Sequence, residues 1–350
     1  MTRSEKAALF RKLASERILV KDGPYGSMIQ TYKLDEDGFR AGRSFNMDQK
    51  GNNDLLNLTR PDVVSEICQA YVDAGADLLA TNSFNANRIS QADYGIQTMA
   101  KEIATASARV IRAVVDAAMA KNPAKPLFVV GALGPTNKTL SISPDVNNPG
   151  YRAVSFEEMR DTYREQIEGL LDGGVDFIAV ETVFDSLNAK AALVAVADAG
   201  EARGEEIPVM CSFTLTDMAG RNLSGQTVEA FWNSMRHAKP LTMGMNCSFG
   251  ATELHPYVGE LNSRVDTLIC VYPNAGLPND MGAYDEPPEM TGRLVGVWAR
   301  NGWINVVGGC CGTTPAHINA IAQSVAGVKP REIPKIGARL RLAGMEAANF

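Results

Sequence analysis

Eight short, nearly continuous apolar runs recur along this chain of 350 residues. Each run is followed by a glycine-bearing or polar segment and then by a stretch with helical periodicity. Runs of this kind are typical of strands that are buried on both faces of a parallel sheet. The expected strands are residues 17–22, 77–82, 127–133, 176–182, 208–214, 242–247, 268–274 and 304–309. The alternation of strand and helix predicts a single-domain (β/α)8 TIM barrel. A doubly wound open sheet is the alternative, and it is disfavoured because no G-x-G-x-x-G follows the first strand.

Three segments lie outside this alternation. Residues 1–16 are expected to form an N-terminal helical extension that covers the bottom of a barrel built from residues 17–328. Residues 329–350, which are rich in proline and charge, are expected to be a C-terminal linker or tail. The segment 136–156 forms a long loop after the third strand, and a loop of that length in a compact domain is usually functional. Between the first two strands, Thr59 is predicted to be the N-cap of a helix.

Composition excludes several classes of protein. The net charge is −6 and no run of Lys or Arg occurs, which argues against a nucleic-acid partner. No apolar run approaches the roughly 18 residues that a membrane span requires. The charged start MTRSEKAALFRKLASER lacks the apolar stretch of a signal peptide, so a cytoplasmic location is expected. Thiols stay reduced there, and clustered cysteines then indicate metal binding or catalysis in preference to disulfides.

In a TIM barrel the functional residues lie where strands end and loops begin. These positions hold Asp22, Thr81, Asn82, Glu181, Thr182, Asn246, Cys247, Asn274, Cys310 and Cys311. Cys247 ends the sixth expected strand, while Cys310 and Cys311 follow the eighth, so the three thiols can meet across the barrel mouth. Flanking glycines would allow the sharp turn that lets adjacent cysteines face one ion. Three thiolates with an open fourth position are an arrangement of catalytic zinc. A vicinal redox pair, or thiols that only pack, are the alternatives.

The chemistry of a zinc ion held by three thiolates is restricted by its charge. The assembly carries a net charge of −1, so it polarises a carbonyl poorly. It still favours a fourth thiolate over a thiol, because metal binding displaces a proton from a group whose pKa is near 8.5. The expected product is an electron-rich thiolate at neutral pH, which is suited to alkyl transfer to sulfur.

Several motifs resemble those of the zinc-dependent homocysteine S-methyltransferases. GGCCGTTPAHI at 308–318 and MNCSFG at 245–250 resemble the two zinc-ligand motifs of that family. Three longer stretches resemble the N-terminal homocysteine-binding module of cobalamin-dependent methionine synthase: TNSFNANRISQADYG (81–95), GPTNKTLSISPDVNNPGYR (134–152) and VETVFDSLNAKAAL (180–193). The resemblance extends over nearly the whole chain and implies a TIM barrel.

The resemblance also implies a set of site residues. Zn2+ would be held by the catalytic cysteines Cys247, Cys310 and Cys311, and L-homocysteine would bind through its thiolate in the fourth position. The substrate-binding residues would be Asp22, Gly23, Asn82, Glu181 and Asn246. Among them Asp22 and Glu181 match the acidic positions that hold the amino-acid end, with Glu181 as the partner of the ammonium group. The family's DGGMGT is DGPYGS at 22–27, and because Pro24 has no N–H, Gly23 or Tyr25 would have to donate to the substrate carboxylate.

The methyl donor that the resemblance implies is methylcobalamin, and the product is methionine. The folate, cobalamin and activation modules of a full methionine synthase are not among these residues. The chain is therefore expected to be an excised fragment, or a subunit that meets a partner carrying cobalamin, with the loop 136–156 as the docking segment. Betaine or S-methylmethionine is an alternative donor, but either would favour an aromatic cage, and Tyr272 is the one aromatic residue near the expected strand ends. A non-catalytic module that binds zinc or homocysteine is a further alternative.

Overall fold

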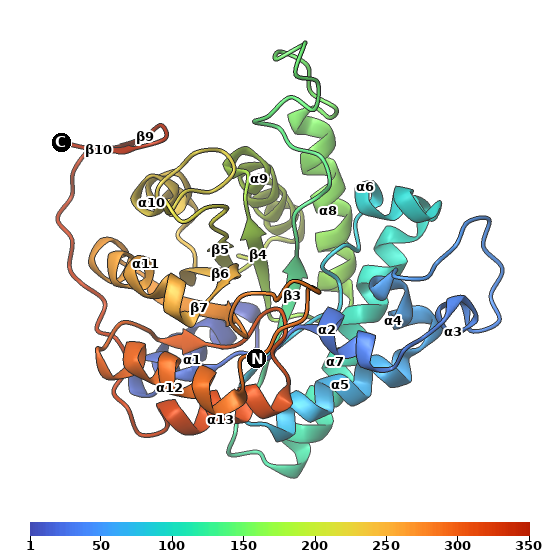
Figure 1. The fold of residues 1–350 in the computed structure, drawn as a ribbon, viewed down its shortest axis with the longest axis horizontal. Helices are drawn as coiled ribbons and strands as arrows, with labels where there is room; N and C mark the ends of the chain where they lie inside the picture. The colour runs from blue at the N-terminus through green and yellow to red at the C-terminus, as the bar shows by residue number, and fades with distance from the viewer.

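Eight parallel strands pair in the order β1-β8-β7-β6-β5-β4-β3-β2 in the computed structural model, which describes residues 1–350. Their bounds are β1 (Leu19–Val20), β2 (Leu78–Ala80), β3 (Phe128–Leu133), β4 (Phe177–Val183), β5 (Val209–Phe213), β6 (Thr242–Gly250), β7 (Leu268–Asn274) and β8 (Val306–Val307). A parallel bridge between Lys21 and Leu78 joins β1 to β2. This contact closes the sheet into a barrel, so the predicted (β/α)8 fold is confirmed (Figure 1).

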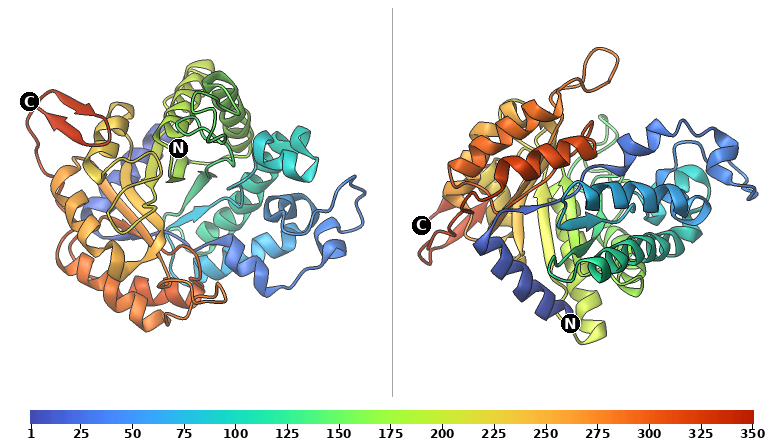
Figure 2. Two further views of the ribbon diagram at one scale, coloured as in Figure 1. Left: turned by 45° about the horizontal axis from the view of Figure 1, so that its top comes forward. Right: turned by 90° about the horizontal axis from the view of Figure 1, so that it is seen from below.

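Helices surround the barrel and connect successive strands (Figures 1 and 2). The main outer helices are α5 (Pro61–Asp73), α7 (Ala100–Lys121), α8 (Phe156–Asp172), α9 (Ser186–Arg203), α10 (Val228–Met235), α11 (Ala251–Arg264), α12 (Pro288–Arg300) and α13 (Pro315–Val325). Shorter helices are α2 (Tyr25–Thr31), α3 (Glu36–Arg40), α4 (Leu56–Thr59) and α6 (Arg88–Gln91), and 3-10 turns are η1 (Asn53–Leu55), η2 (Ala92–Tyr94), η3 (Gln97–Met99) and η4 (Arg236–Ala238). The largest apolar cluster, of 69 buried residues, lies between the helices and the strands.

Helix α1 (Arg3–Glu16) lies against the N-terminal end of the barrel (Figure 2). Its Phe10 is fully buried and packs edge-on against Phe128 and Phe177, with ring centroids 5.7 and 5.4 Å away. Just after the helix, Arg17 pairs with the buried Asp77 at 2.8 Å. These contacts close one end of the barrel, so the strand C-termini at the other end form the open mouth.

One helix start differs from the prediction. Thr59 does not cap α5, because it already forms the last residue of α4, and its hydroxyl donates to the Leu55 carbonyl at 3.3 Å. Arg60 is the N-cap residue of α5 and makes no side-chain capping bond. The prediction failed because the short helix α4 precedes α5 directly and uses the threonine side chain for its own turn.

The residues expected to be a linker or tail include a hairpin. Strands β9 (Arg341–Ala343) and β10 (Ala347–Asn349) pair in antiparallel fashion, and Figure 1 shows them beside α10. Asn233 of α10 donates to the Asn349 side chain at 3.1 Å. Arg331 is buried and donates to the Thr267 carbonyl at 2.8 Å, which fixes the start of this segment.

No helix of the structure combines the length and the apolar character that crossing a membrane requires.

Candidate metal and substrate site

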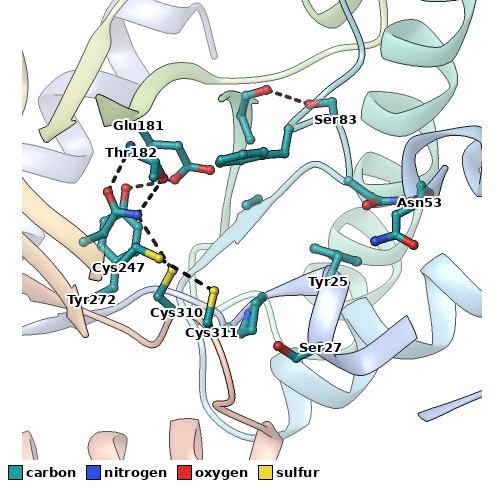
Figure 3. Close-up of a pocket in the computed structure, with 18 of the residues that line it drawn as sticks. Tyr25, Ser27, Asn53, Ser83, Glu181, Thr182, Cys247, Tyr272, Cys310 and Cys311 are labelled. Atoms are coloured by element: carbon teal, nitrogen blue, oxygen red, sulfur yellow. Dashed lines mark hydrogen bonds between the residues drawn. The ribbon is translucent and has the colours of Figure 1, made fainter. Parts of the chain in front are cut away.

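A cavity of about 230 Å³ opens at the mouth of the barrel, where the strands end. Its wall is built by the ends of β2, β3, β4, β6 and β7 and by the segments that follow β1, β2 and β8. Of the eight substrate, metal or catalytic residues expected from the sequence, seven line it: Gly23, Asn82, Glu181, Asn246, Cys247, Cys310 and Cys311. Asp22 does not line it. Figure 3 shows the three cysteine side chains pointing toward one another, with Glu181 and Tyr272 beside them.

The three thiols form a compact donor set. The Sγ atoms of Cys247, Cys310 and Cys311 all lie within 4.8 Å of one another, and those of Cys247 and Cys311 are 3.7 Å apart. A tetrahedral zinc ion with bonds of about 2.3 Å would place its sulfur ligands about 3.8 Å apart. The arrangement of the three sulfur atoms therefore fits a zinc ion, and each cysteine remains partly exposed to the cavity.

Local backbone geometry turns these thiols toward one point. Cys247 and Ser248 adopt left-handed conformations with φ of 63° and 62°, at a register shift between β6 and β7. On the other side Thr313 closes a turn by donating its N–H to the Cys310 carbonyl at 3.0 Å. Gly312 needs its positive φ of 78°, whereas a Cβ at Gly309 would lie 2.2 Å from the Thr313 hydroxyl. Glycines thus serve both backbone conformation and close approach around the adjacent cysteines.

Without a metal, the three thiols share one negative charge. Hydrogen bonds from Cys310 and Cys311 lower the pKa of Cys247 to about 3. The same interaction with the Cys247 thiolate raises the pKa of Cys310 well above its usual value and that of Cys311 to about 11. The cluster therefore holds one thiolate and two thiols at neutral pH, which is a partly prepared site for a cation.

Glu181 is the acidic residue of the cavity wall that lies beside the cysteines, and Asp54 also lines the cavity. Glu181 is 8% exposed, and its Oε2 accepts a hydrogen bond from the Tyr272 hydroxyl at 2.8 Å. Burial raises the pKa of Glu181, and the nearby Lys21 partly opposes that shift. A buried carboxylate of this kind is a favourable partner for a bound ammonium group, whose charge would stabilise its ionised form.

Asp22 lies behind the cavity wall. It is fully buried, and its two oxygens accept from the Ala80 N–H at 2.7 Å and from Lys21 Nζ at 3.1 Å. Burial raises the pKa of Asp22, with Lys21 acting in the opposite direction. Lys21, which the sequence analysis did not identify, lines the cavity in its place. An inward-facing lysine in a strand could have been found only by assigning the alternate residues of β1 to the barrel interior.

Asn246 connects the strand ends around the thiols. Its Oδ1 accepts from the Ser212 hydroxyl at 2.6 Å and from the Thr182 N–H at 3.0 Å. Its Nδ2 donates to the Thr182 hydroxyl at 2.8 Å and approaches Cys310 Sγ at 3.8 Å. Its polar atoms are therefore already used within the protein, so it holds β4, β5 and β6 together beside the cysteine cluster.

The remaining two expected substrate-binding residues, Asn82 and Gly23, line the part of the cavity that follows β2 and β1. Asn82 donates to the Asn53 carbonyl at 2.8 Å. Gly23 makes no hydrogen bond through its N–H, and a Cβ there would lie 2.7 Å from the Tyr71 hydroxyl. Two aromatic residues that lie outside the strand ends also line the cavity: Tyr25, the first residue of α2, and Phe84, in the loop after β2.

This protein is a TIM barrel with three thiols and a buried carboxyl group at its mouth. Such a site is suited to bind a thiophilic metal and a small substrate. Residues 19–325 match the family model described as homocysteine S-methyltransferase, and the chain belongs to this family. The structure is similar to that of the homocysteine methyltransferase MmuM from Escherichia coli in its metallated form, with 23% identity, a TM-score of 0.67 and coverage of 89% of this chain and 98% of that one. The oxidized form of MmuM gives 23% identity, a TM-score of 0.69 and coverage of 90% and 98%. At this level of identity the similarity supports the barrel fold.

Proposed function

We propose that this chain binds one Zn2+ through Cys247, Cys310 and Cys311 and activates L-homocysteine for methylation to methionine. The observation that carries the proposal is the convergence of three Sγ atoms within 4.8 Å at the barrel mouth of a homocysteine S-methyltransferase. When bound, zinc supplies positive charge that lowers the pKa of the substrate thiol, so that its sulfur is a nucleophile at neutral pH.

The chain's own residues orient the substrate. Glu181, held by the Tyr272 hydroxyl, accepts the ammonium group of the amino acid. Asn246 positions the end of β4, which carries Glu181, relative to Cys310. The amino-acid end and the sulfur are thereby held at fixed places, which leaves the sulfur facing the open mouth for in-line transfer of a methyl group.

We propose methylcobalamin, carried by a partner chain or module, as the methyl donor. The support is a rim of exposed apolar side chains on the loops that follow β1, β3, β5 and β7. This rim consists of Met47, Ile142, Val146, Tyr151, Met218, Leu223, Leu277 and Met281. Val146 and Met281 are 94% and 93% exposed. Exposed apolar side chains on several loops at one end of a barrel offer contacts to a docking protein, and a small diffusible donor would not require them.

Betaine or S-methylmethionine is the competing donor. The sequence disfavoured these donors because Tyr272 was the one aromatic residue found near the strand ends. Tyr25 and Phe84 also line the cavity, so aromatic content no longer separates the two classes of donor. The apolar rim remains the observation that favours a donor carried by a protein.

A donor assay tests the proposal. The zinc-loaded protein is given homocysteine together with methylcobalamin on a corrinoid protein, free methylcobalamin, betaine or S-methylmethionine in turn, and methionine is measured. Methionine formation with the corrinoid protein is the expected result. Turnover with betaine or S-methylmethionine alone would replace the proposed donor. Binding of zinc and homocysteine without turnover on any donor would favour the non-catalytic module.

Metal analysis tests the ligand set independently. We expect one zinc ion per chain, and Cys310→Ala should lose it because one of three protein ligands is removed. Cys211→Ala is the matched control, because Cys211 is a buried thiol of β5 outside the cluster. Unchanged zinc content in Cys310→Ala would reject the proposed ligands.

A further inference from the structure

Lys21 is the one cationic side chain among the residues that line the cavity. Its side chain is 6% exposed, and its Nζ donates to Asp22 Oδ1 at 3.1 Å. The same ammonium group lies 4.6 Å from the centroid of the Tyr272 ring. An ammonium group has three N–H donors, so Asp22 occupies one, and the other two have no hydrogen-bond acceptor in the protein.

The surroundings of Lys21 keep it charged. Burial alone would lower the pKa of Lys21, but the carboxylates of Asp22 and Glu181 outweigh this effect and the pKa is raised. Tyr272 contacts both charged groups, since its ring faces Lys21 and its hydroxyl donates to Glu181. Tyr272 therefore links the ammonium group of Lys21 and the carboxylate of Glu181 within one part of the cavity wall.

A substrate bound at the cysteines needs a positively charged partner for its carboxylate. An amino acid that places its sulfur among Cys247, Cys310 and Cys311 brings a carboxylate into a cavity whose lining already includes the acidic residues Glu181 and Asp54. A buried carboxylate without a partner is strongly disfavoured. No arginine and no second lysine lines the cavity. Gly23 offers a backbone N–H that makes no hydrogen bond within the protein, but Pro24 beside it offers none, and a neutral N–H brings no charge. Lys21 is the group that can supply the missing positive charge.

We propose that Lys21 binds the carboxylate of the substrate while Glu181 binds its ammonium group, so that the pair recognises a zwitterionic α-amino thiol. This assignment rests on the proposed function, because it requires the substrate sulfur to lie at the cysteine cluster. Asp22 then has an indirect part: it holds Lys21 in place through one oxygen and is itself held by the Ala80 N–H through the other.

The test compares variants that differ at Lys21. Lys21→Met removes the ammonium group but leaves Asp22 buried without a counter-ion, so the fold itself could be lost. The double variant Lys21→Met/Asp22→Asn removes one charge of each sign, keeps the net charge of the pair, and retains an oxygen that can accept from Ala80. Lys125→Met is the matched control, because Lys125 donates to the Gly75 carbonyl at 3.1 Å, before the N-terminal end of β2.

Three thiols are titrated into each zinc-loaded protein by calorimetry: homocysteine, 3-aminopropane-1-thiol, which lacks the carboxylate, and 4-mercaptobutanoate, which lacks the ammonium group. The double variant should bind homocysteine and 4-mercaptobutanoate about 10- to 100-fold more weakly than the unmodified protein. Its affinity for 3-aminopropane-1-thiol should be unchanged.

Two results would overturn the assignment. Unchanged homocysteine affinity in the double variant would show that Lys21 only neutralises Asp22. An equal loss of affinity for all three thiols would show that the substitutions disturb the cavity as a whole. The proposed function fails separately, and the role of Lys21 with it, if the unmodified zinc-loaded protein binds none of the three thiols.

Discussion

Zinc binding to the metal-free protein should release two protons per ion at about pH 7. A zinc site requires its cysteine ligands as thiolates. Cys247 has a pKa lowered to about 3, so it has already lost its proton. The pKa of Cys310 is raised well above its usual value and that of Cys311 to about 11, so both still carry protons that the metal must displace. Homocysteine should then release one further proton, because its thiol is mostly protonated in solution.

The number of protons released also determines how zinc affinity depends on pH. With two protons displaced, the apparent association constant should rise about 100-fold for each unit of pH in the neutral range. The direction of this pH dependence follows from the raised pKa values of Cys310 and Cys311. Both thiols are protonated in the metal-free protein, and these protons compete with zinc less as the pH increases. Affinity should therefore be lost as the pH falls below neutrality.

Calorimetric titration in buffers of different ionisation enthalpy measures the number of protons released. Cys211→Ala should release the same number as the unmodified protein, because the thiol of Cys211 is buried outside the cluster. Release of three protons would refute the reasoning, because it would mean that the metal-free cluster holds no thiolate. Release of one proton or none would point to a different set of ligands.

Three other substitutions test separate parts of the molecule. Glu181→Gln should weaken homocysteine binding about 10- to 100-fold while zinc is retained, and an unchanged affinity in calorimetry would reject its role toward the ammonium group. The double variant Val146→Ser/Met281→Ser should raise the KM for a methylated corrinoid protein and leave homocysteine affinity unchanged, because both side chains lie on the exposed rim; an unaltered KM would remove the rim from the docking surface. Phe10→Ala should lower the free energy of unfolding by about 3–5 kcal/mol, since it empties a fully buried aromatic site. A loss below about 1 kcal/mol in chemical denaturation would show that α1 does not unfold together with the barrel.

The barrel could be predicted from the sequence because its signal is periodic and local. Every observed barrel strand overlaps one of the eight expected runs, although β1 and β8 are only two residues long, Leu19–Val20 and Val306–Val307. The meeting of Cys247 with Cys310 and Cys311 followed from strand order alone, because strand ends in a parallel barrel share one face. These predictions did not require knowledge of any side-chain contact.

Features that depend on side-chain direction or on loops were not predicted. Lys21 follows three apolar residues and could be taken for the solvated end of a strand. Its interior position follows only when alternate residues of β1 are assigned to the inside of a closed barrel. The side chains of Tyr25, at the start of α2, and of Phe84, in the loop after β2, reach the cavity from segments whose path the periodicity of strands does not specify. The hairpin of β9 and β10 was missed because its strands have three residues each and lie in a segment rich in charge.

Backbone strain at the strand ends gives Asn246, which was expected to bind the substrate, a structural role as well. Six non-glycine residues have positive φ, and three of them, Thr182, Cys247 and Ser248, lie at the strand ends that carry the site. Such conformations cost about 1–3 kcal/mol each and persist only where the surroundings enforce them. Asn246 provides that enforcement at β4, because it bonds both the N–H and the hydroxyl of Thr182. At β6 the hydroxyl of Ser248 bonds that of Thr214 at 2.8 Å. The strained conformation that directs the Cys247 thiol is therefore imposed by neighbouring strands. The MNCSFG motif indicated Cys247 as an expected ligand, but it could not reveal this conformation.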